Sequence, residues 1–302
     1  MKIGVIGLGI MGKQMAKHLI NSGYETYLFD INTAVVNELA TLGGHACESN
    51  KEVANICNVI ITMLPAAKHV QEVLFSDEGV AKNGNPNSII IDMSSVSPEE
   101  SRTFAAGLKE YGMHFLDAPV SGGEPMAIEG RLSIMVGGEE EHFNKVLPLF
   151  KAMGENVVHV GPNGAGSATK LVNQIMVSAH LAALSEACVF ASKSGIDLNK
   201  MYQAIHGGLA GSAVMDAKMP KIINRDFEPG GRIEINYKDL LNVQSSANAI
   251  GVPLPVTNLV KEIFSSEIVN GNSKKDHSHI INFFEKMANH QIPKKTTTEV
   301  KS

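Results

Sequence analysis

Cysteine is scarce in this sequence and forms no recognisable pattern. The 302 residues include three cysteines, Cys47, Cys57 and Cys188. The number is odd, there is no CxxC pair, and the spacings fit no zinc site. This composition argues against a disulfide framework and against a cysteine-based zinc centre. It favours buried thiols in a protein of a reducing compartment.

The sequence also lacks a surplus of basic residues and a long apolar run. Lys and Arg total 26 against 31 Asp and Glu, so the formal net charge is −5. A nucleic acid is therefore not an expected partner. We expect no apolar run of the ~20 residues that a membrane span needs. The apolar N-terminus is typical of a first strand followed by a glycine-rich turn, and it does not resemble a signal peptide. A cytoplasmic protein that contacts neither membrane nor nucleic acid is predicted.

The first half of the sequence alternates short apolar segments with helical ones. The expected strands are Lys2–Gly7, Tyr24–Phe29, Val59–Met63, Ser88–Asp92, Phe115–Ala118 and Leu132–Val136. The expected helices are Lys13–Ser22, Ala34–Leu42, Lys51–Asn55, Val70–Leu74 and Pro98–Tyr111. Near-continuous apolar strands alternating with helices indicate a parallel sheet covered on both faces. The predicted fold class is therefore α/β, beginning with a Rossmann-type doubly wound sheet.

The second half is predicted to be an all-helical C-terminal domain. Residues 166–194 contain no proline and would form a helix about 43 Å long, ended by Gly195. Residues 1–163 are the expected dinucleotide-binding domain, and residues 164–290 the expected substrate and oligomerisation domain. The tail, residues 291–302, is rich in Lys and Thr and is expected to be disordered. Further helices are expected at Asn199–Ile205, Lys238–Ala249, Thr257–Ser266 and His279–Ala288.

A glycine-rich segment follows the first expected strand and opens the first helix. Gly7, Gly9 and Gly12 form a GxGxxG pattern that encloses Ile10 and Met11. In this context the first glycine permits a tight turn, the second lets the backbone approach a pyrophosphate, and the third permits close helix–strand packing. The helix N-terminus would supply N–H donors to the phosphates. A dinucleotide site is predicted; the alternative is a glycine turn without a ligand.

The choice of dinucleotide depends on the end of the second expected strand. Asp30 stands there, 18 residues after Gly12. Its carboxylate can accept hydrogen bonds from the adenosine ribose and would repel a 2′-phosphate. The residues that follow, 31–33, contain no Arg or Lys to bind such a phosphate. The sequence therefore favours NAD over NADP.

Two later strand ends are expected to face the same crevice, because ligands of doubly wound sheets bind beyond the carboxyl ends of strands. Met63, Leu64 and Pro65 follow one strand, and Ser95 follows the next. Ser95 is the candidate for the nicotinamide side of the cofactor. Ser97, just before a proline, is as readily explained as a helix cap.

Three segments could supply the chemistry of a reaction, and the first two are a glycine turn and one face of the long helix. Ser121, Gly122 and Gly123 offer a hydroxyl and consecutive backbone N–H groups that suit a carboxylate; the alternative is an ordinary glycine turn. Lys170, Asn173 and Gln174 are spaced to share one face of the long helix, where the lysine and the two amides would bind the substrate. Burial there would lower the pKa of the lysine toward a range useful in acid/base catalysis. The alternative is a solvated lysine on an amphipathic helix.

A third segment, Tyr237–Leu240, is expected to open a helix, and Lys238 could reach the cofactor or form a surface ion pair. His206, His277 and His279 are possible acid/base groups without a recognisable partner pattern. His277 and His279 lack further ligands nearby in the sequence, so no metal site is predicted.

Taken together, these segments resemble the β-hydroxyacid dehydrogenase family, which includes 3-hydroxyisobutyrate and 6-phosphogluconate dehydrogenases. The resemblance covers the chain to about His290. It rests on four motifs in the family's order: Gly7–Met15 (GLGIMGKQM), Asp117–Gly123 (DAPVSGG), Gly164–Gln174 (GAGSATKLVNQ) and Lys238–Leu240 (KDL). Four further stretches are similar to the tartronate semialdehyde reductase branch: Ser121–Pro125, Leu132–Gly138, Gly207–Ser212 and Asp276–Ser278.

The resemblance implies a role for each motif. Lys170 would be the catalytic acid/base; Ser121, Gly122, Gly123 and Asn173 would bind the substrate carboxylate. Lys238 and Ser95 would contact the cofactor. The implied reaction is reduction of tartronate semialdehyde to D-glycerate by a homodimer or homotetramer. Many relatives carry two asparagines after the lysine, whereas here the second is Gln174, which would reshape the pocket.

Two alternatives remain at this stage. A substrate such as 3-hydroxyisobutyrate or another small 3-hydroxy acid would keep the chemistry, and the Gly207–Ser212 loop is where the two specificities would differ. A non-catalytic dinucleotide-binding module is the more distant alternative. The presence of Lys170 argues against it.

Overall fold

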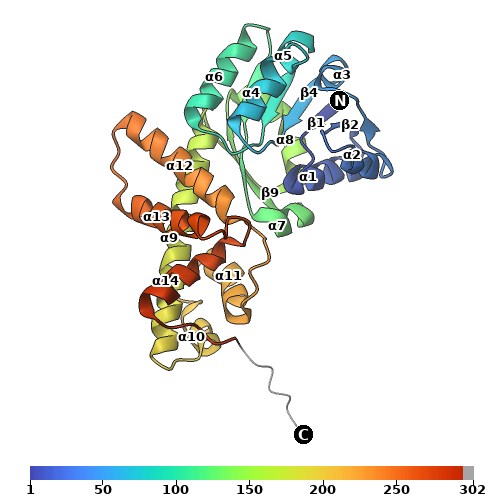
Figure 1. Ribbon diagram of the computed structural model, residues 1–302. Helices are drawn as coiled ribbons and strands as arrows, with labels where there is room; N and C mark the ends of the chain where they lie inside the picture. Colours follow the sequence, from blue (N-terminus) through green and yellow to red (C-terminus); the bar gives the residue numbers. More distant parts are fainter. Residues whose placement is uncertain (295–302) are drawn as a thin grey trace. The chain divides into compact units, whose positions relative to one another are not determined.

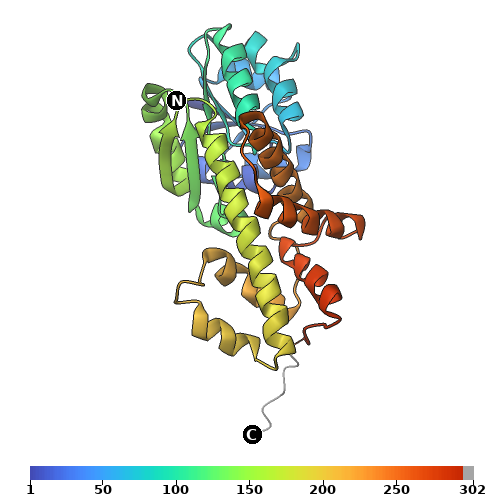
Figure 2. The same cartoon turned by 90° about the vertical axis from the view of Figure 1, so that its left-hand side faces the viewer.

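The computed structural model describes residues 1–294. The chain divides into two compact units, unit 1 from Met1 to Val172 and unit 2 from Asn173 onward. The division lies inside helix α9 (Ala165–Lys193), which Figure 2 shows as one unbroken helix. The residues predicted to form the disordered tail fall largely outside the described part. Ile292 is an exception, because it is buried and donates its backbone N–H to Glu285 at 2.9 Å.

Unit 1 contains a nine-stranded sheet in the order β3-β2-β1-β4-β5-β6-β8-β7, with β9 paired to β8. The strands are β1 (Lys2–Ile6), β2 (Glu25–Phe29), β3 (His45–Ala46), β4 (Val59–Thr62), β5 (Ile89–Asp92), β6 (His114–Asp117), β7 (Val120–Ser121), β8 (Leu132–Gly137) and β9 (Gly154–Gly161). Strands β1 to β6 are parallel, as predicted. The sheet is mixed beyond them, because β8 runs antiparallel to β6 and β7.

Helices cover both faces of this sheet (Figure 1). On one face, Ile3 and Ile61 of the strands pack in a cluster with Met15 and Phe150. On the other face, the alternate strand residues pack with helices α3, α4 and α6. This two-sided burial confirms the doubly wound fold. The helices of unit 1 are α1 (Ile10–Asn21), α2 (Thr33–Ala40), α3 (Asn50–Ile56), α4 (Ala67–Phe75), α5 (Val80–Asn83), α6 (Pro98–Lys109), α7 (Gly123–Glu129) and α8 (Glu140–Met153).

Unit 2 is helical, as predicted. Its core forms around the second half of α9, where Leu181 packs with Phe264 and Cys188 packs with Met219 and Ile222. The other helices are α10 (Leu198–Ile205), α11 (Ala213–Asn224), α12 (Ile233–Ile250), α13 (Pro255–Val269), the short 3₁₀ helix η1 (His277–Ile280) and α14 (Ile281–Ala288).

Two long helices were not predicted, and both contain an internal proline. Pro148 lies within α8 and Pro220 lies within α11. Proline removes a backbone hydrogen bond and normally ends a helix. Here each helix continues past it and buries a face, with Phe143 and Phe150 of α8 packed in the unit 1 core. Tertiary packing therefore outweighs the local cost of the proline.

The expectation that no segment is apolar enough to cross a membrane is wrong for α9. Among the described residues this helix has the length and composition of a membrane span. A buried helix in a protein core passes the same test. In α9 the most apolar window is 44% buried within the structure, and Leu181, Leu184 and Cys188 belong to the core of unit 2.

Candidate functional site

The glycine-rich turn between β1 and α1 has the stereochemistry of a dinucleotide loop. Gly7 has a φ of +93°, and a Cβ there would lie 2.4 Å from the backbone oxygen of Met63. A Cβ on Gly12 would lie 2.0 Å from the oxygen of Gly7. A Cβ on Gly9 would meet nothing within 4 Å. Packing thus requires the first and third glycines, while the second leaves open space at the start of α1, where a phosphate would approach.

Ile10 and Met11 form the first turn of α1. The Ile10 side chain is exposed, whereas Met11 packs partly against the core. Their backbone N–H groups belong to the first turn of the helix, where intrahelical acceptors are lacking. These residues can therefore serve a dinucleotide through the backbone, which is consistent with their apolar side chains.

The Asp30 carboxylate holds the glycine-rich turn in place. One oxygen accepts a hydrogen bond from the backbone N–H of Leu8 at 2.6 Å, and the other accepts from that of Asn32 at 2.7 Å. Each carboxylate oxygen has a second lone pair, so the group can still accept hydrogen bonds from ribose hydroxyls. The neighbouring Ile31 side chain is 95% exposed and offers no charge to a 2′-phosphate.

A buried polar network joins the ends of β4 and β5, where the sequence placed Met63, Leu64, Pro65 and Ser95. The Asp92 carboxylate accepts hydrogen bonds from the hydroxyls of Thr62 at 2.8 Å and Ser94 at 2.5 Å. The Ser94 hydroxyl in turn accepts from the backbone N–H of Leu64 at 2.9 Å. Burial raises the pKa of Asp92 to about 6, although the hydrogen bonds from Ser94 and Thr62 act to lower it. The network fixes the path of both loops.

Sequence reasoning missed Asp92 and Ser94 and chose the next serine, Ser95, which is half-buried. An Asp at a strand end followed by two serines was the available signal. Ser97 caps a helix, which confirms the interpretation given for it from the sequence. It forms a capping box with Glu100 at the start of α6.

The first residue of the DAPVSGG motif anchors the helix that carries Lys170. Asp117 ends β6 and is fully buried. Its two carboxylate oxygens accept hydrogen bonds from the backbone N–H groups of Gly164 and Ser167, both at 2.8 Å. Burial raises the pKa of Asp117, and these N–H groups oppose the shift. A negative charge at the N-terminus of α9 is also favoured by the helix dipole.

Ser121, Gly122 and Gly123 follow Asp117 a few residues later in the chain. Ser121 ends β7 and pairs with Ser133 of β8. Gly122 has a φ of +129° and Gly123 a φ of +65°, and α7 begins at Gly123. Both glycines are exposed. Their positive φ values favour glycine, which explains the glycine pair locally, and both glycines lie at the start of α7, where backbone N–H groups lack intrahelical acceptors.

The three polar residues predicted on the long helix all lie on α9. Lys170 and Asn173 are half-buried, and Gln174 is buried. In unit 2 the Gln174 amide donates a hydrogen bond to the Asp239 carboxylate at 2.7 Å. The other Asp239 oxygen lies 3.2 Å from the Lys238 ammonium. Gln174 thus belongs to a buried chain that leads to Lys238.

The prediction that Lys238 opens a helix is wrong. Helix α12 begins at Ile233, which is buried. Lys238 is therefore inside the helix, where the neighbouring Asp239 carboxylate is fixed by Gln174. The segment Arg232–Glu234 is held by backbone bonds to residues 273 and 275, a long-range arrangement that local sequence does not reveal.

The histidines considered as acid/base groups differ in their surroundings. His206 is exposed. His277 contacts the Asn236 amide oxygen through Nδ1 at 2.8 Å, and His279 contacts Glu267 through Nδ1 at 2.7 Å. Adjacent Asp276 is buried and accepts from the Ser278 hydroxyl at 2.7 Å and the Lys218 ammonium at 3.0 Å. The Asp276–Ser278 stretch thus organises the interior of unit 2.

The three cysteines are free and buried, as predicted. Burial raises the pKa of Cys47 to about 11 and the pKa values of Cys57 and Cys188 to about 12. Thiols with such pKa values carry almost no reactive thiolate at neutral pH. They act as small apolar core residues.

Comparison with known proteins agrees with these local arrangements. Residues 2–161 match the sequence family described as the NAD binding domain of 6-phosphogluconate dehydrogenase. Residues 164–284 match the sequence family described as NAD-binding of NADP-dependent 3-hydroxyisobutyrate dehydrogenase. These two matches meet close to the start of α9 and cover both units.

Individual relatives extend over nearly the whole chain. The 2-hydroxy-3-oxopropionate reductase of Escherichia coli (strain K12) is 43% identical, covering 97% of this chain and 100% of its own. The 2-(hydroxymethyl)glutarate dehydrogenase of Eubacterium barkeri is 38% identical, covering 95% of each. The crystal structure of a 3-hydroxyisobutyrate dehydrogenase from Salmonella typhimurium superimposes with a TM-score of 0.84 at 31% identity, covering 93% of this chain and 99% of that one.

Proposed function

Because the chain belongs to the β-hydroxyacid dehydrogenase family, we propose that it reduces tartronate semialdehyde (2-hydroxy-3-oxopropanoate) to D-glycerate with NADH. Membership makes it an NAD(P)-dependent dehydrogenase with a nicotinamide-dinucleotide domain. Family membership does not specify the substrate, since relatives of similar sequence are named for different hydroxy acids. It is supported by 43% identity over the full length of the E. coli reductase.

The assignment of Lys170 as the catalytic residue rests on the hydrogen bonds of the Asp117 carboxylate. This carboxylate ties the end of β6 to Gly164 and Ser167, at the start of the helix on which Lys170 lies. Ser121 and the glycine pair follow within a few residues of the same strand end. A substrate carboxylate held by Ser121 and these N–H groups would therefore be oriented relative to Lys170 by unit 1 alone.

Two residues of α9, Lys170 and Asn173, would act on the substrate in the reaction. When bound, the nicotinamide cofactor supplies hydride to the aldehyde carbon. Lys170, in its ammonium form, would donate a hydrogen bond from Nζ to the carbonyl oxygen and then its proton as negative charge develops there. Asn173, one turn further on α9, would bind the substrate as a second polar contact. In the reverse direction neutral Lys170 would accept the alcohol proton.

The preference for NADH over NADPH rests on Asp30. Its carboxylate stands beside the glycine turn and accepts the Leu8 N–H. A second negative group, the 2′-phosphate, would be repelled at this position. Lys238 and Ser95 are proposed to contact the cofactor at its nicotinamide end.

A substrate panel tests the proposal. Initial rates should be measured with tartronate semialdehyde and NADH, with NADPH in its place, and in the oxidative direction with D-glycerate and 3-hydroxyisobutyrate. We expect the highest kcat/KM for tartronate semialdehyde with NADH. A higher value in the 3-hydroxyisobutyrate reaction would favour the alternative substrate. Absence of turnover with every acid would favour a non-catalytic dinucleotide-binding module.

We propose further that the protein is a cytoplasmic homodimer or homotetramer. Helix α9 carries exposed apolar side chains at Val172, Met176 and Phe190, which are 59%, 50% and 72% exposed. Their spacing places them along one side of the helix, and a second copy could cover them. Light scattering coupled to size exclusion should give a mass of two or four chains; a monomer would contradict the proposal.

A further inference from the structure

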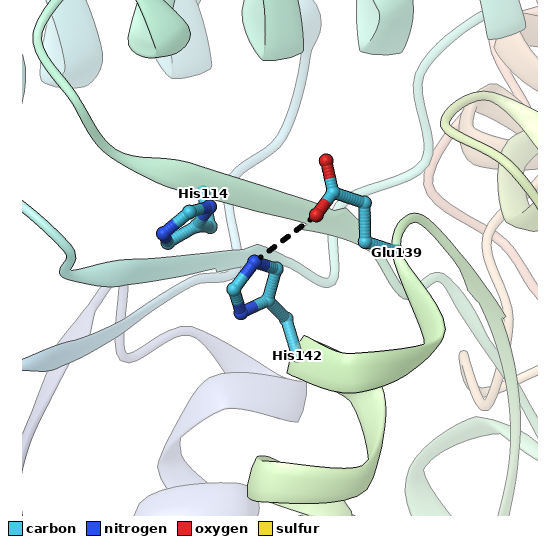
Figure 3. Close-up of side chains that lie close together, drawn as sticks. All are labelled: His114, Glu139 and His142. Atoms are coloured by element: carbon cyan, nitrogen blue, oxygen red, sulfur yellow. Dashed lines mark ion pairs between the residues drawn. The ribbon is translucent and has the colours of Figure 1, made fainter.

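A cluster of two histidines and a glutamate lies in unit 1 and takes no part in the proposed reaction. Figure 3 shows His114, Glu139 and His142 side by side, and their candidate ligand atoms all lie within 4.8 Å of one another. Nε2 of His142 is 3.2 Å from a carboxylate oxygen of Glu139. The rings of His114 and His142 are stacked with centroids 3.6 Å apart.

The backbone brings these three side chains together from two separate segments. His114 is the first residue of β6. Glu139 precedes the first turn of α8, and the backbone N–H of His142 bonds to its oxygen at 3.1 Å. Between β8 and α8, Gly138 has a φ of +138°, and a Cβ there would lie 2.5 Å from Leu116. Only glycine allows this turn to lie so close to β6.

The His142 ring is the more buried of the two histidines. The His142 side chain is only 7% exposed, and its Nδ1 has no hydrogen-bond partner within residues 1–294. Nε2 faces the Glu139 carboxylate, so the ring proton can reside on Nδ1 when Nε2 binds an ion.

We propose that His114, Glu139 and His142 bind one Zn²⁺ ion. Two imidazole nitrogens and a carboxylate oxygen form a donor set that zinc accepts, with water in the fourth position. Ligands of a tetrahedral zinc ion lie about 3.3 Å apart, given metal–ligand distances of about 2.0–2.1 Å. Nε2 of His142 and the Glu139 oxygen already have this separation. Two imidazoles on one ion cannot stay stacked, because each binds through a lone pair in the plane of its ring, so the half-buried His114 ring would turn out of the stack. The Glu139 side chain is 69% exposed and is free to follow.

The ion would join the start of β6 to the first turn of α8. Because it would bind the folded unit and not the unfolded chain, it would raise the stability of unit 1. His114 is at the amino end of β6, whereas Asp117 and the substrate motif follow the carboxyl end. The proposed zinc site is therefore separate from the substrate motif, and its loss should leave NADH-dependent turnover unchanged.

Zinc binding can be measured on the full chain without an affinity tag, after treatment with a chelator. Titration calorimetry with ZnCl₂ should give one ion per chain, and ZnCl₂ should raise the melting temperature. MgCl₂ should cause no such rise, because magnesium prefers oxygen ligands. His114→Gln and Glu139→Gln should each weaken zinc binding at least about tenfold and remove most of the thermal shift.

His45→Gln is the matched control, since His45 is an exposed histidine of the same unit that stacks on Tyr27. It should bind zinc as the wild type does. Glu139→Gln changes an exposed side chain, so it remains informative if the His114 variant folds poorly. The proposal is overturned if the wild type binds no zinc, or if the cluster variants bind it as tightly as His45→Gln. Turnover is a separate readout that reports on the proposed function.

Discussion

The amide of Gln174 donates a hydrogen bond to the buried carboxylate of Asp239 at 2.7 Å. The sequence placed Gln174 among the substrate-binding residues and singled it out as a departure from relatives with a second asparagine. In the structure its amide nitrogen is engaged with Asp239, whose other oxygen lies beside the Lys238 ammonium. We therefore interpret Gln174 as a residue that positions Asp239 and, through it, Lys238.

Replacing Gln174 with methionine should lower the free energy of unfolding by about 1–3 kcal/mol, because Asp239 would lose a donor to a buried carboxylate. The methionine is similar in size, so packing changes little. Urea unfolding followed by circular dichroism measures the loss. Gln203→Met, at an exposed position of α10, should be nearly neutral. Equal effects of the two substitutions would contradict this role for Gln174.

Lys170→Ala should bind NADH as the wild type does and lose turnover by about 10²–10⁴-fold, the usual effect of removing a general acid. Cofactor binding can be followed by NADH fluorescence, which suffers no background from tryptophan because the chain has none. Lys200→Ala removes an exposed lysine of α10 and should leave kcat unchanged. Near wild-type turnover in Lys170→Ala would remove this lysine from the mechanism.

Asp30→Ser should reduce the preference for NADH over NADPH at least about tenfold, which corresponds to about 1.4 kcal/mol. The hydroxyl removes the charge that would repel a 2′-phosphate while keeping a polar group near Leu8 and Asn32. The measurement is the ratio of kcat/KM values with the two cofactors. Asp77→Ser, which removes an exposed carboxylate paired with Lys82, is the control. An unchanged ratio in Asp30→Ser would show that cofactor choice lies elsewhere.

His277 should make the protein less stable as the pH falls from 7.5 to 5. Burial, assisted by the nearby Lys218 ammonium, lowers the pKa of His277 to about 4, despite the Asp276 carboxylate. The unfolded chain protonates near pH 6.5, so the folded state loses up to about 2 kcal/mol over this range. The lowered pKa of Asp276 changes the stability only below pH 4, so it does not contribute between pH 7.5 and 5.

His277→Asn should abolish that part of the pH dependence, because asparagine does not titrate and its amide can still face Asn236. Urea unfolding at the two pH values measures the difference. His206→Asn, an exposed histidine, should keep the wild-type slope. If His277→Asn also keeps it, the histidine is not buried in its neutral form.

Local sequence patterns predicted the fold where local and tertiary preferences agree. The apolar run of β4 and the glycine that ends α9 are examples: Val59–Thr62 is buried throughout, and Gly195 has a φ of +77°. Predictions failed where a distant contact decides the conformation. Pro148 and Pro220 lie inside helices that packing sustains. Lys238 lies inside α12 because residues far along the chain hold the earlier start of that helix.

The sequence by itself determined the alternation of strands and helices, the glycine turn with Asp30, and the set of family motifs, because these depend on neighbouring residues and fixed spacings. Only the tertiary structure revealed how buried carboxylates connect them. Asp117 fixes the start of α9, and Asp92 joins two strand ends. Gln174 was chosen from its spacing to Lys170, but its partner Asp239 is 65 residues away. A buried charge must find its donors in three dimensions, and spacing along the chain cannot specify which ones it meets.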